Sequence, residues 1–140
     1  MKKVLLVGAI ILLTTGCGAD DYNYECKKVG TNEAFKKTEI IKIGIDDKKV
    51  YKLDSNITEE HTSEDSVNNA YANYQNLYNN YNENNVKAEY KKNEKKLIAT
   101  YHLDKSDIDN MKIELPYDFS LEENKFIKSV EDLGFECKEK

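Results

Sequence analysis

The chain has 140 residues and a formal net charge of −5, and all 21 of its basic residues are lysines. A chain of this length fits one domain with a modest hydrophobic core. No extended basic patch follows the first residues, so the net acidity argues against nucleic-acid binding and against adhesion of the domain itself to anionic lipid.

The first 16 residues have the layout of an export signal. Lys2 and Lys3 precede an apolar run at residues 4–13, which is shorter than the about 20 residues that span a bilayer. Gly16 followed by Cys17 resembles a bacterial lipobox, and this resemblance implies a diacylglycerol on the Cys17 thiol and cleavage after Gly16. We therefore expect residues 1–16 to be a lipoprotein signal peptide.

The lipobox departs from the usual pattern at one position. A Leu usually stands three residues before the Cys, where this chain has Thr14. The alternative is ordinary signal-peptidase cleavage near Gly16 or Gly18, which would release the protein. If Cys17 is lipidated, residues 17–21 form a tether that reaches at most about 18 Å and holds the domain near the outer face of the cell membrane.

The chain has three cysteines, Cys17, Cys26 and Cys137. If lipid modifies Cys17, the remaining pair is expected to form a disulfide outside the cytosol. The bridge would join both ends of the domain and close a loop of about 110 residues, which the chain-entropy model equates with roughly 4–5 kcal/mol. Two buried free thiols are the alternative. A metal site is less favoured, because these cysteines and two distant histidines lack the usual short ligand spacing.

Residues 22–60 are expected to form three strands, since apolar and polar residues alternate there. The segments are 22–29, 35–45 and 50–60, separated by turns at residues 30–32 and 46–47.

Residues 63–83 are predicted to form a long amphipathic helix. Thr62 or Ser63 can cap its start, and Asn84 or Asn85 tolerates the left-handed conformation that ends many helices. One face of this helix carries an apolar stripe, formed by Val67, Ala70, Tyr71, Tyr74, Leu77, Tyr78 and Tyr81.

The second half of the chain is expected to add two strands, at residues 86–90 and 97–103, with a turn at Asn93–Glu94 and a short helical turn after Asp104 or Ser106. Ser120 to Glu123 form a capping-box pattern with Glu123 at the third helical position, and Gly134 fits the end of the helix that follows. Residues 22–140 are thus predicted to be a single globular α+β domain. Its antiparallel sheet of four to five strands would pack on the central helix, with a C-terminal helix, in β-β-β-α-β-β-α order.

The anchor cysteine, the strand pairs, the central helix and a C-terminal helix ending in Leu133-Gly134-Phe135 together resemble the small bacterial lipoproteins of the YehR-like family, a domain family of unknown function. The resemblance covers nearly all of the chain through topology and weak motifs. It brings no catalytic residues, and the Cys26 and Cys137 pair is not part of it.

The tyrosines are the candidate binding residues. The chain has ten Tyr and no Trp, and tyrosine gives amphipathic contact area at low entropic cost. Tyr71, Tyr74, Tyr78 and Tyr81 share the helix stripe. Two interpretations remain open for them: a ligand platform, or buried rings of a small core with their hydroxyls at its edge.

No known catalytic motif, metal-binding spacing or phosphate loop is present, so we expect neither a cofactor nor a metal. His61 and His102 are each expected at the surface. The acidic residues around His61, at positions 59, 60, 64 and 65, are interpreted as a solvated junction between strand and helix.

These observations predict a non-enzymatic, membrane-anchored binding or interaction module of the cell envelope. Its partner would be an envelope protein or a small molecule near the membrane. The alternative is a small secreted or envelope hydrolase with a site around His102.

Overall fold

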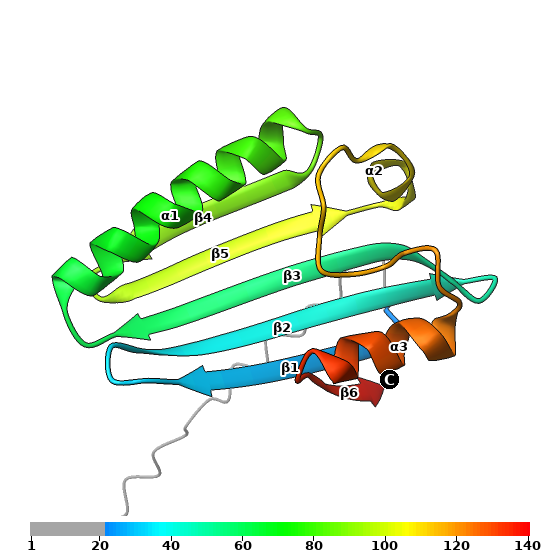
Figure 1. Ribbon diagram of the computed structural model, residues 1–140, viewed down its shortest axis with the longest axis horizontal. Coiled ribbons are helices and arrows are strands. Elements are labelled where there is room, and N and C mark those ends of the chain that lie inside the picture. The colour runs from blue at the N-terminus through cyan, green and yellow to red at the C-terminus, as the bar shows by residue number, and fades with distance from the viewer. Residues whose placement is uncertain (1–21) are drawn as a thin grey trace, which may run out of the picture.

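The computed structural model describes residues 22–140, which form one antiparallel sheet and three helices (Figure 1). The predicted signal peptide, Cys17 and the tether at residues 17–21 lie outside the described residues. No described helix combines the length and apolarity needed to cross a bilayer. The elements in chain order are β1 (Tyr24–Thr31), β2 (Phe35–Asp46), β3 (Lys49–His61), α1 (Glu64–Glu83), β4 (Lys87–Asn93), β5 (Lys96–Leu103), α2 (Lys105–Asn110), α3 (Glu123–Asp132) and β6 (Glu136–Glu139).

The helices of residues 22–140 cover one face of the sheet only. Its strand order is β4-β5-β3-β2-β1-β6, with every neighbouring pair antiparallel. Figure 1 shows α1 over β4 and β5, and α3 over β1 at the other side of the sheet. We call this the helix face, and the opposite side the open face. The predicted α+β class is therefore confirmed, with six strands in place of four to five.

Strand alternation makes the two faces chemically different. On β3, Leu53 and Ile57 are buried on the helix face, whereas Asp54 and Asn56 lie on the open face. The buried apolar residues form one core, which comprises Cys26, Ile41, Ile43, Val50, Leu53, Ile57, Val67, Tyr78, Tyr81, Val86, Ala88, Leu97, Ala99, Tyr101, Leu103, Phe126, Val130 and Phe135.

Capping side chains and residues with positive φ set the ends of α1 and the hairpin turns. Of the two proposed caps, Ser63 is the one used, because its Oγ accepts a hydrogen bond from the Ser66 N–H at 3.1 Å. Asn85 adopts φ 67°, as expected just after the helix. Asp47 and Lys48 both have positive φ, which gives the β2–β3 turn the twist that a hairpin needs. The turn between β4 and β5 lies one residue later than predicted, with Glu94 at φ 52°.

Residues 111–122 form an extended strap across the helix face (Figure 1). Every second residue packs against the core, from Met111 to Leu121, although the strap pairs with no strand. The predicted capping box after Ser120 is wrong, because α3 begins at Glu123 and Glu122 caps it without a side-chain bond. The Ser120 hydroxyl donates to Asp118 Oδ1 at 2.5 Å instead, and this local turn replaces the cap.

The sixth strand, β6, follows the C-terminal helix and was not among the predicted strands. It pairs with β1 and places Cys137 directly opposite Cys26. The two cysteines form the predicted disulfide, with an S–S distance of 2.06 Å and a separation of 111 positions in sequence. The bridge covalently ties the C-terminal edge of the sheet to the strand beside it.

Tyrosine rings make up much of the core beneath α1. Tyr78 is 1% exposed and stacks on Tyr81, with ring centroids 5.2 Å apart. Tyr74 and Tyr101 meet Tyr78 edge-on, at 5.5 Å and 6.2 Å. Edge-to-face and offset pairs of this kind add stabilisation beyond their buried area. Leu77 departs from the predicted stripe, since it is 44% exposed.

Several tyrosine hydroxyls are held in their neutral form. Burial raises the pKa of Tyr117 to about 12. The hydrogen bond that the Tyr24 hydroxyl donates to Glu123 at 2.8 Å raises the pKa of Tyr24 to about 12. Burial likewise raises the pKa of Tyr78 and Tyr74 well above 10.0. The folded state therefore resists loss of these phenolic protons.

Replacing both Cys26 and Cys137 with serine should lower stability by about 4 kcal/mol, because the unfolded chain would gain the freedom of a long open loop. Urea unfolding of oxidised, reduced and substituted protein measures the loss. Reduced wild-type protein should match the double variant. Equal urea midpoints for oxidised and reduced protein would show that the bridge does not constrain the unfolded chain.

Alkaline pH should unfold the protein between about pH 10 and 12. An unfolded tyrosine titrates near 10.0, whereas Tyr24 and Tyr117 titrate near 12 in the folded state. Their stabilisation is thus complete below pH 10 and is lost as the pH rises through the folded values. Tyrosinate absorbance and circular dichroism, followed together, test this. Titration of all ten tyrosines near pH 10 with secondary structure intact would contradict it.

Candidate functional site

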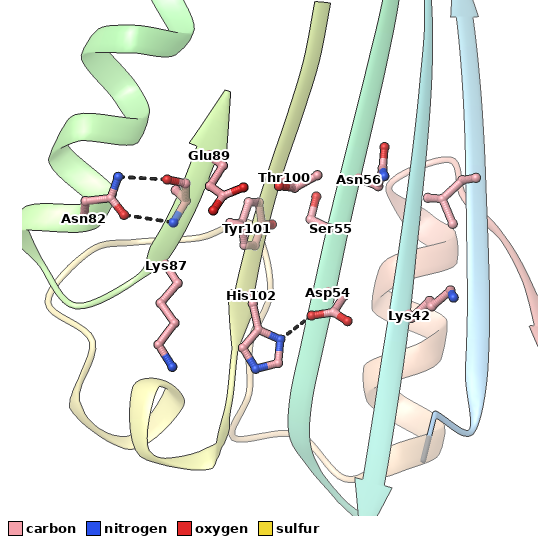
Figure 2. A pocket seen from close by; sticks show the side chains of 12 residues that line it. Lys42, Asp54, Ser55, Asn56, Asn82, Lys87, Glu89, Thr100, Tyr101 and His102 are labelled. Carbon is pink, nitrogen blue, oxygen red and sulfur yellow. Dashed lines mark hydrogen bonds and ion pairs between the residues drawn. The ribbon is translucent and has the colours of Figure 1, made fainter. Parts of the chain in front are cut away.

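The open face carries a hollow of about 630 Å³ across β4, β5, β3 and β2 (Figure 2). This volume lies within the range of small-molecule sites. The side chains come from four hydrogen-bonded strands, so the backbone holds them at fixed spacings. The open-face residues that line the hollow are Ile40, Lys42, Asp54, Asn56, Lys87, Glu89, Thr100 and His102.

The sheet register arranges these side chains in two cross-strand rows. In the first row His102 lies between Lys87 on β4 and Asp54 on β3, and Asp54 in turn faces Lys42 on β2. Residues directly opposite in an antiparallel pair have Cβ atoms about 5 Å apart. Two lysines therefore flank a histidine–aspartate pair at short intervals along this row.

The second row is mostly uncharged and lies one pleat further along the strands. Thr100 is opposite both Glu89 and Asn56, and Asn56 is opposite Ile40. The row adds a hydroxyl, an amide, a carboxylate and an apolar side chain to the hollow. A ligand lying across both rows would meet hydrogen-bond donors and acceptors from four strands.

Asp54 is the centre of the hydrogen bonding in the hollow. Its Oδ1 pairs with Nδ1 of His102, as Figure 2 shows, and its Oδ2 accepts a hydrogen bond from the Tyr22 hydroxyl. The Lys52 ammonium lies 4.2 Å from the centroid of the Tyr22 ring, within the range of a cation–π contact. These contacts fix the orientation of Asp54 and His102, whose side chains are 39% and 40% exposed.

The lip of the hollow at β4 is closed by an asparagine from α1. The Asn82 side chain donates from Nδ2 to the Ala88 carbonyl and accepts from the Ala88 N–H, both at 2.9 Å (Figure 2). The amide thus pairs with an edge strand as a neighbouring strand would. It satisfies backbone groups that sheet edges otherwise leave open, and it ties the C-terminal end of α1 to the site.

The pair of Asp54 and His102 provides part of the geometry of a hydrolytic triad. An aspartate that accepts a hydrogen bond from a histidine Nδ1–H orients the ring as in hydrolase triads, and leaves Nε2 as the acceptor. A triad also needs a nucleophile, yet no Ser, Thr or Cys hydrogen-bonds to His102 in the part of the chain described. Ser55 points to the helix face and is 4% exposed. Within residues 22–140, no three His, Cys, Asp or Glu side chains gather as a metal site requires.

The sequence-predicted tyrosines lie on the other face of the sheet. Tyr78 and Tyr81 are buried in the core, so the core interpretation describes these two rings. Tyr71 and Tyr74 are half-buried against the same core. None of the four lines the hollow on the open face.

His61 is buried, which corrects the expectation of a surface residue. Its Nε2 lies 2.8 Å from Glu59 Oε2 and its Nδ1 lies 2.7 Å from Ser66 Oγ. Glu59 is also buried and accepts a hydrogen bond from the Tyr74 hydroxyl at 2.9 Å. Only part of the junction that was expected to be solvated is therefore exposed. Glu59 and His61 face the helix layer, while Glu60, Glu64 and Asp65 are exposed.

Sequence reasoning identified His102 but missed the residues around it. Asp54, Asn56 and Thr100 are ordinary polar residues at alternating positions, a pattern that every solvated sheet face shares. What singles them out is that β3 and β5 are neighbours in the sheet, although α1 and β4 separate them in the chain. No local signal in the sequence encodes that pairing.

Comparisons with known proteins identify no relative. No family model matches the chain, and neither the curated proteins nor the solved structures contain a significant match.

Proposed function

We propose that this protein is a non-enzymatic binding module, anchored by lipid at the outer face of the cell membrane, whose open-face hollow holds a polar ligand or a polar loop of an envelope protein. The observation that carries the proposal is a sheet face that no helix of residues 22–140 covers, with its hollow of about 630 Å³. A sheet face that is neither covered by helices nor apolar is free to receive a partner from solvent.

The lining defines the chemistry of that partner. Lys42 and Lys87 supply positive charge, and Glu89 supplies negative charge on the same hollow. The Lys87 side chain is 72% exposed, and its ammonium lies 4.0 Å from Asp104 Oδ2. A ligand can therefore reach this ammonium without breaking a strong ion pair. A partner with both signs of charge and several hydrogen-bonding groups, such as a peptide, complements this pattern better than an apolar molecule would.

The location rests on the export signal and the short tether. Lipid on Cys17 would place the domain within about 18 Å of the membrane surface, so the partner should be a membrane protein or a molecule delivered there. The resemblance to YehR-like lipoproteins agrees with this location and adds no activity.

A second candidate function, hydrolysis, is favoured by one observation, the hydrogen bond between Asp54 and His102. In this alternative His102 would act as a general base on a water or on a substrate hydroxyl. Binding is preferred because the hollow offers hydrogen-bonding groups along its whole length, whereas no nucleophile is aligned with the histidine.

The anchor is tested by Cys17→Ala. This variant should lose metabolic labelling with palmitate and either leave the membrane fraction or accumulate as unprocessed precursor. Cys26→Ala is the matched control and should retain the label. Unchanged labelling of Cys17→Ala would refute lipidation at this residue.

The binding face is tested with a photo-crosslinking amino acid at Thr100, in the full-length protein in its native membrane. Position 125, exposed on α3 and on the other face, is the control. We expect a defined adduct at position 100 that is absent at position 125 and is lost when Glu89→Lys reverses a charge of the hollow. The same adducts at both positions, insensitive to Glu89→Lys, would rule out this site.

The variant His102→Gln distinguishes the two candidate functions. It keeps a side-chain hydrogen-bond donor for Asp54 but removes the imidazole that would act as a general base. A binding module should retain both the crosslink and its cellular role in this variant. A variant that keeps the crosslink but reproduces the deletion phenotype would favour the hydrolase.

A further inference from the structure

A second cavity lies on the helix face, between α1, the strap and the sheet. Its volume is about 270 Å³. Its polar and aromatic lining includes Glu39 and Lys37 of β2, Tyr74 and Tyr78 of α1, Tyr101 of β5 and Tyr117 of the strap. The sheet separates it from the open-face hollow, although Ser55 and Tyr101 border both cavities.

Tyr78 supplies the observation that points to a ligand. The residue is 1% exposed, and its hydroxyl is the buried side-chain oxygen without a hydrogen-bond partner among residues 22–140. Buried tyrosine hydroxyls normally find a partner, because leaving one unpaired costs about 1–3 kcal/mol. Two neighbouring tyrosine hydroxyls are engaged. Tyr74 donates to Glu59, and Tyr101 is hydrogen-bonded with Ser55 and Tyr117.

Negative charge surrounds the unpaired hydroxyl. Glu39 lines the cavity with its side chain only 22% exposed, and Glu59 lies behind Tyr74. After burial itself and the neighbouring Tyr81, the Glu39 carboxylate is among the groups that raise the pKa of Tyr78, so its field reaches the Tyr78 oxygen. The oxygen is therefore better placed to accept a hydrogen bond from a cation than to bind an anion.

The aromatic lining favours the same class of ligand. Five tyrosine rings, including Tyr81, line the cavity beside a carboxylate. They make an environment in which a cation gains both ion pairing and cation–π attraction. Lys37 already forms an ion pair in this cavity. Its Nζ lies 3.5 Å from Glu39 Oε1, and its side chain is 32% exposed. Its partial exposure means that its ammonium can turn to solvent when another cation takes its place.

From these contacts we infer that the tyrosine-lined cavity binds a small organic amine in its protonated form. The ammonium donates one N–H to Tyr78 Oη and another to Glu39, and the rings of Tyr74 and Tyr101 flank it. A quaternary ammonium cannot donate a hydrogen bond and would leave the Tyr78 oxygen unpaired. The cavity should therefore prefer primary amines.

The test uses full-length protein in detergent micelles, titrated with n-butylammonium and followed by backbone amide chemical shifts. n-Butanol is the neutral control of equal length, and tetramethylammonium is the quaternary control. We expect shifts in α1 and the strap with n-butylammonium, and binding at least about tenfold weaker for both controls. Equal binding of n-butanol or of tetramethylammonium would overturn the inference.

Three substitutions locate the site. Glu39→Gln should weaken n-butylammonium about tenfold, and Tyr78→Phe should weaken it severalfold while leaving the urea midpoint of the free protein unchanged or raised, since it removes an unpaired buried hydroxyl. Lys37→Gln should strengthen binding, because it removes the competing internal cation. A purely structural cluster would not respond in these opposite directions.

The matched controls are Glu131→Gln and Lys128→Gln on α3, which are exposed and away from the cavity. Both should bind n-butylammonium as the parent does. Binding unaffected by Glu39→Gln and Tyr78→Phe, in variants with parental urea midpoints, would overturn the assignment of this cavity.

Discussion

The structure depends on a sheet that is covered on one face only. Strand alternation sends Leu53 and Ile57 of β3 toward the helices and Asp54 and Asn56 away from them, and a slip of one residue would exchange the two sets. The apolar side therefore needs a complete cover, whereas the polar side needs none. The hollow on the open face exists because the chain buries its apolar area elsewhere.

The two longer helices do not cover the helix face by themselves, and the strap covers the rest. α1 lies over one side of the sheet and α3 over the other, and the strap crosses the gap between them (Figure 1). The strap packs every second residue inward without a strand partner. Hydrogen bonds from Lys49 to the Ser120 carbonyl and between Tyr117 and Tyr101 add to this side-chain packing. Large tyrosine rings fill the remaining space beneath α1. Because each ring ends in a hydroxyl, this filling brings polar groups inside, and one of them, Tyr78 Oη, is left unpaired.

The sequence was most informative where one period extends over many residues. The β2–β3 hairpin, α1 and β5 were predicted within one or two residues, because burial of one face decides their conformation along their whole length. β6 has only four residues, and a segment this short is too brief for an alternating pattern to predict a strand. The strap alternates from Met111 to Leu121, but the residues from Ser120 to Glu123 match a capping-box pattern, which predicts a helix start in its place. His61 was misplaced because its burial depends on Glu59 and Ser66, partners that only the folded chain brings to both of its ring nitrogens.

The candidate sites could not be predicted from the sequence for a further reason. Residues that are adjacent in the sequence point to opposite faces of the sheet. The Asp54 side chain belongs to the open-face hollow and the Ser55 side chain points to the helix side. His102 and Tyr101 divide in the same way, although Ser55 and Tyr101 also border the hollow. Conservation or mutational sensitivity averaged over these positions would merge two different environments. A substitution at 54 or 102 changes the solvated rows and leaves the tyrosine packing in place, whereas one at 55 or 101 disturbs buried hydroxyls beneath α1. The backbone of β3 and β5 is therefore the partition between two chemically distinct surfaces, and the effect of any change is decided by the parity of its position along the strand.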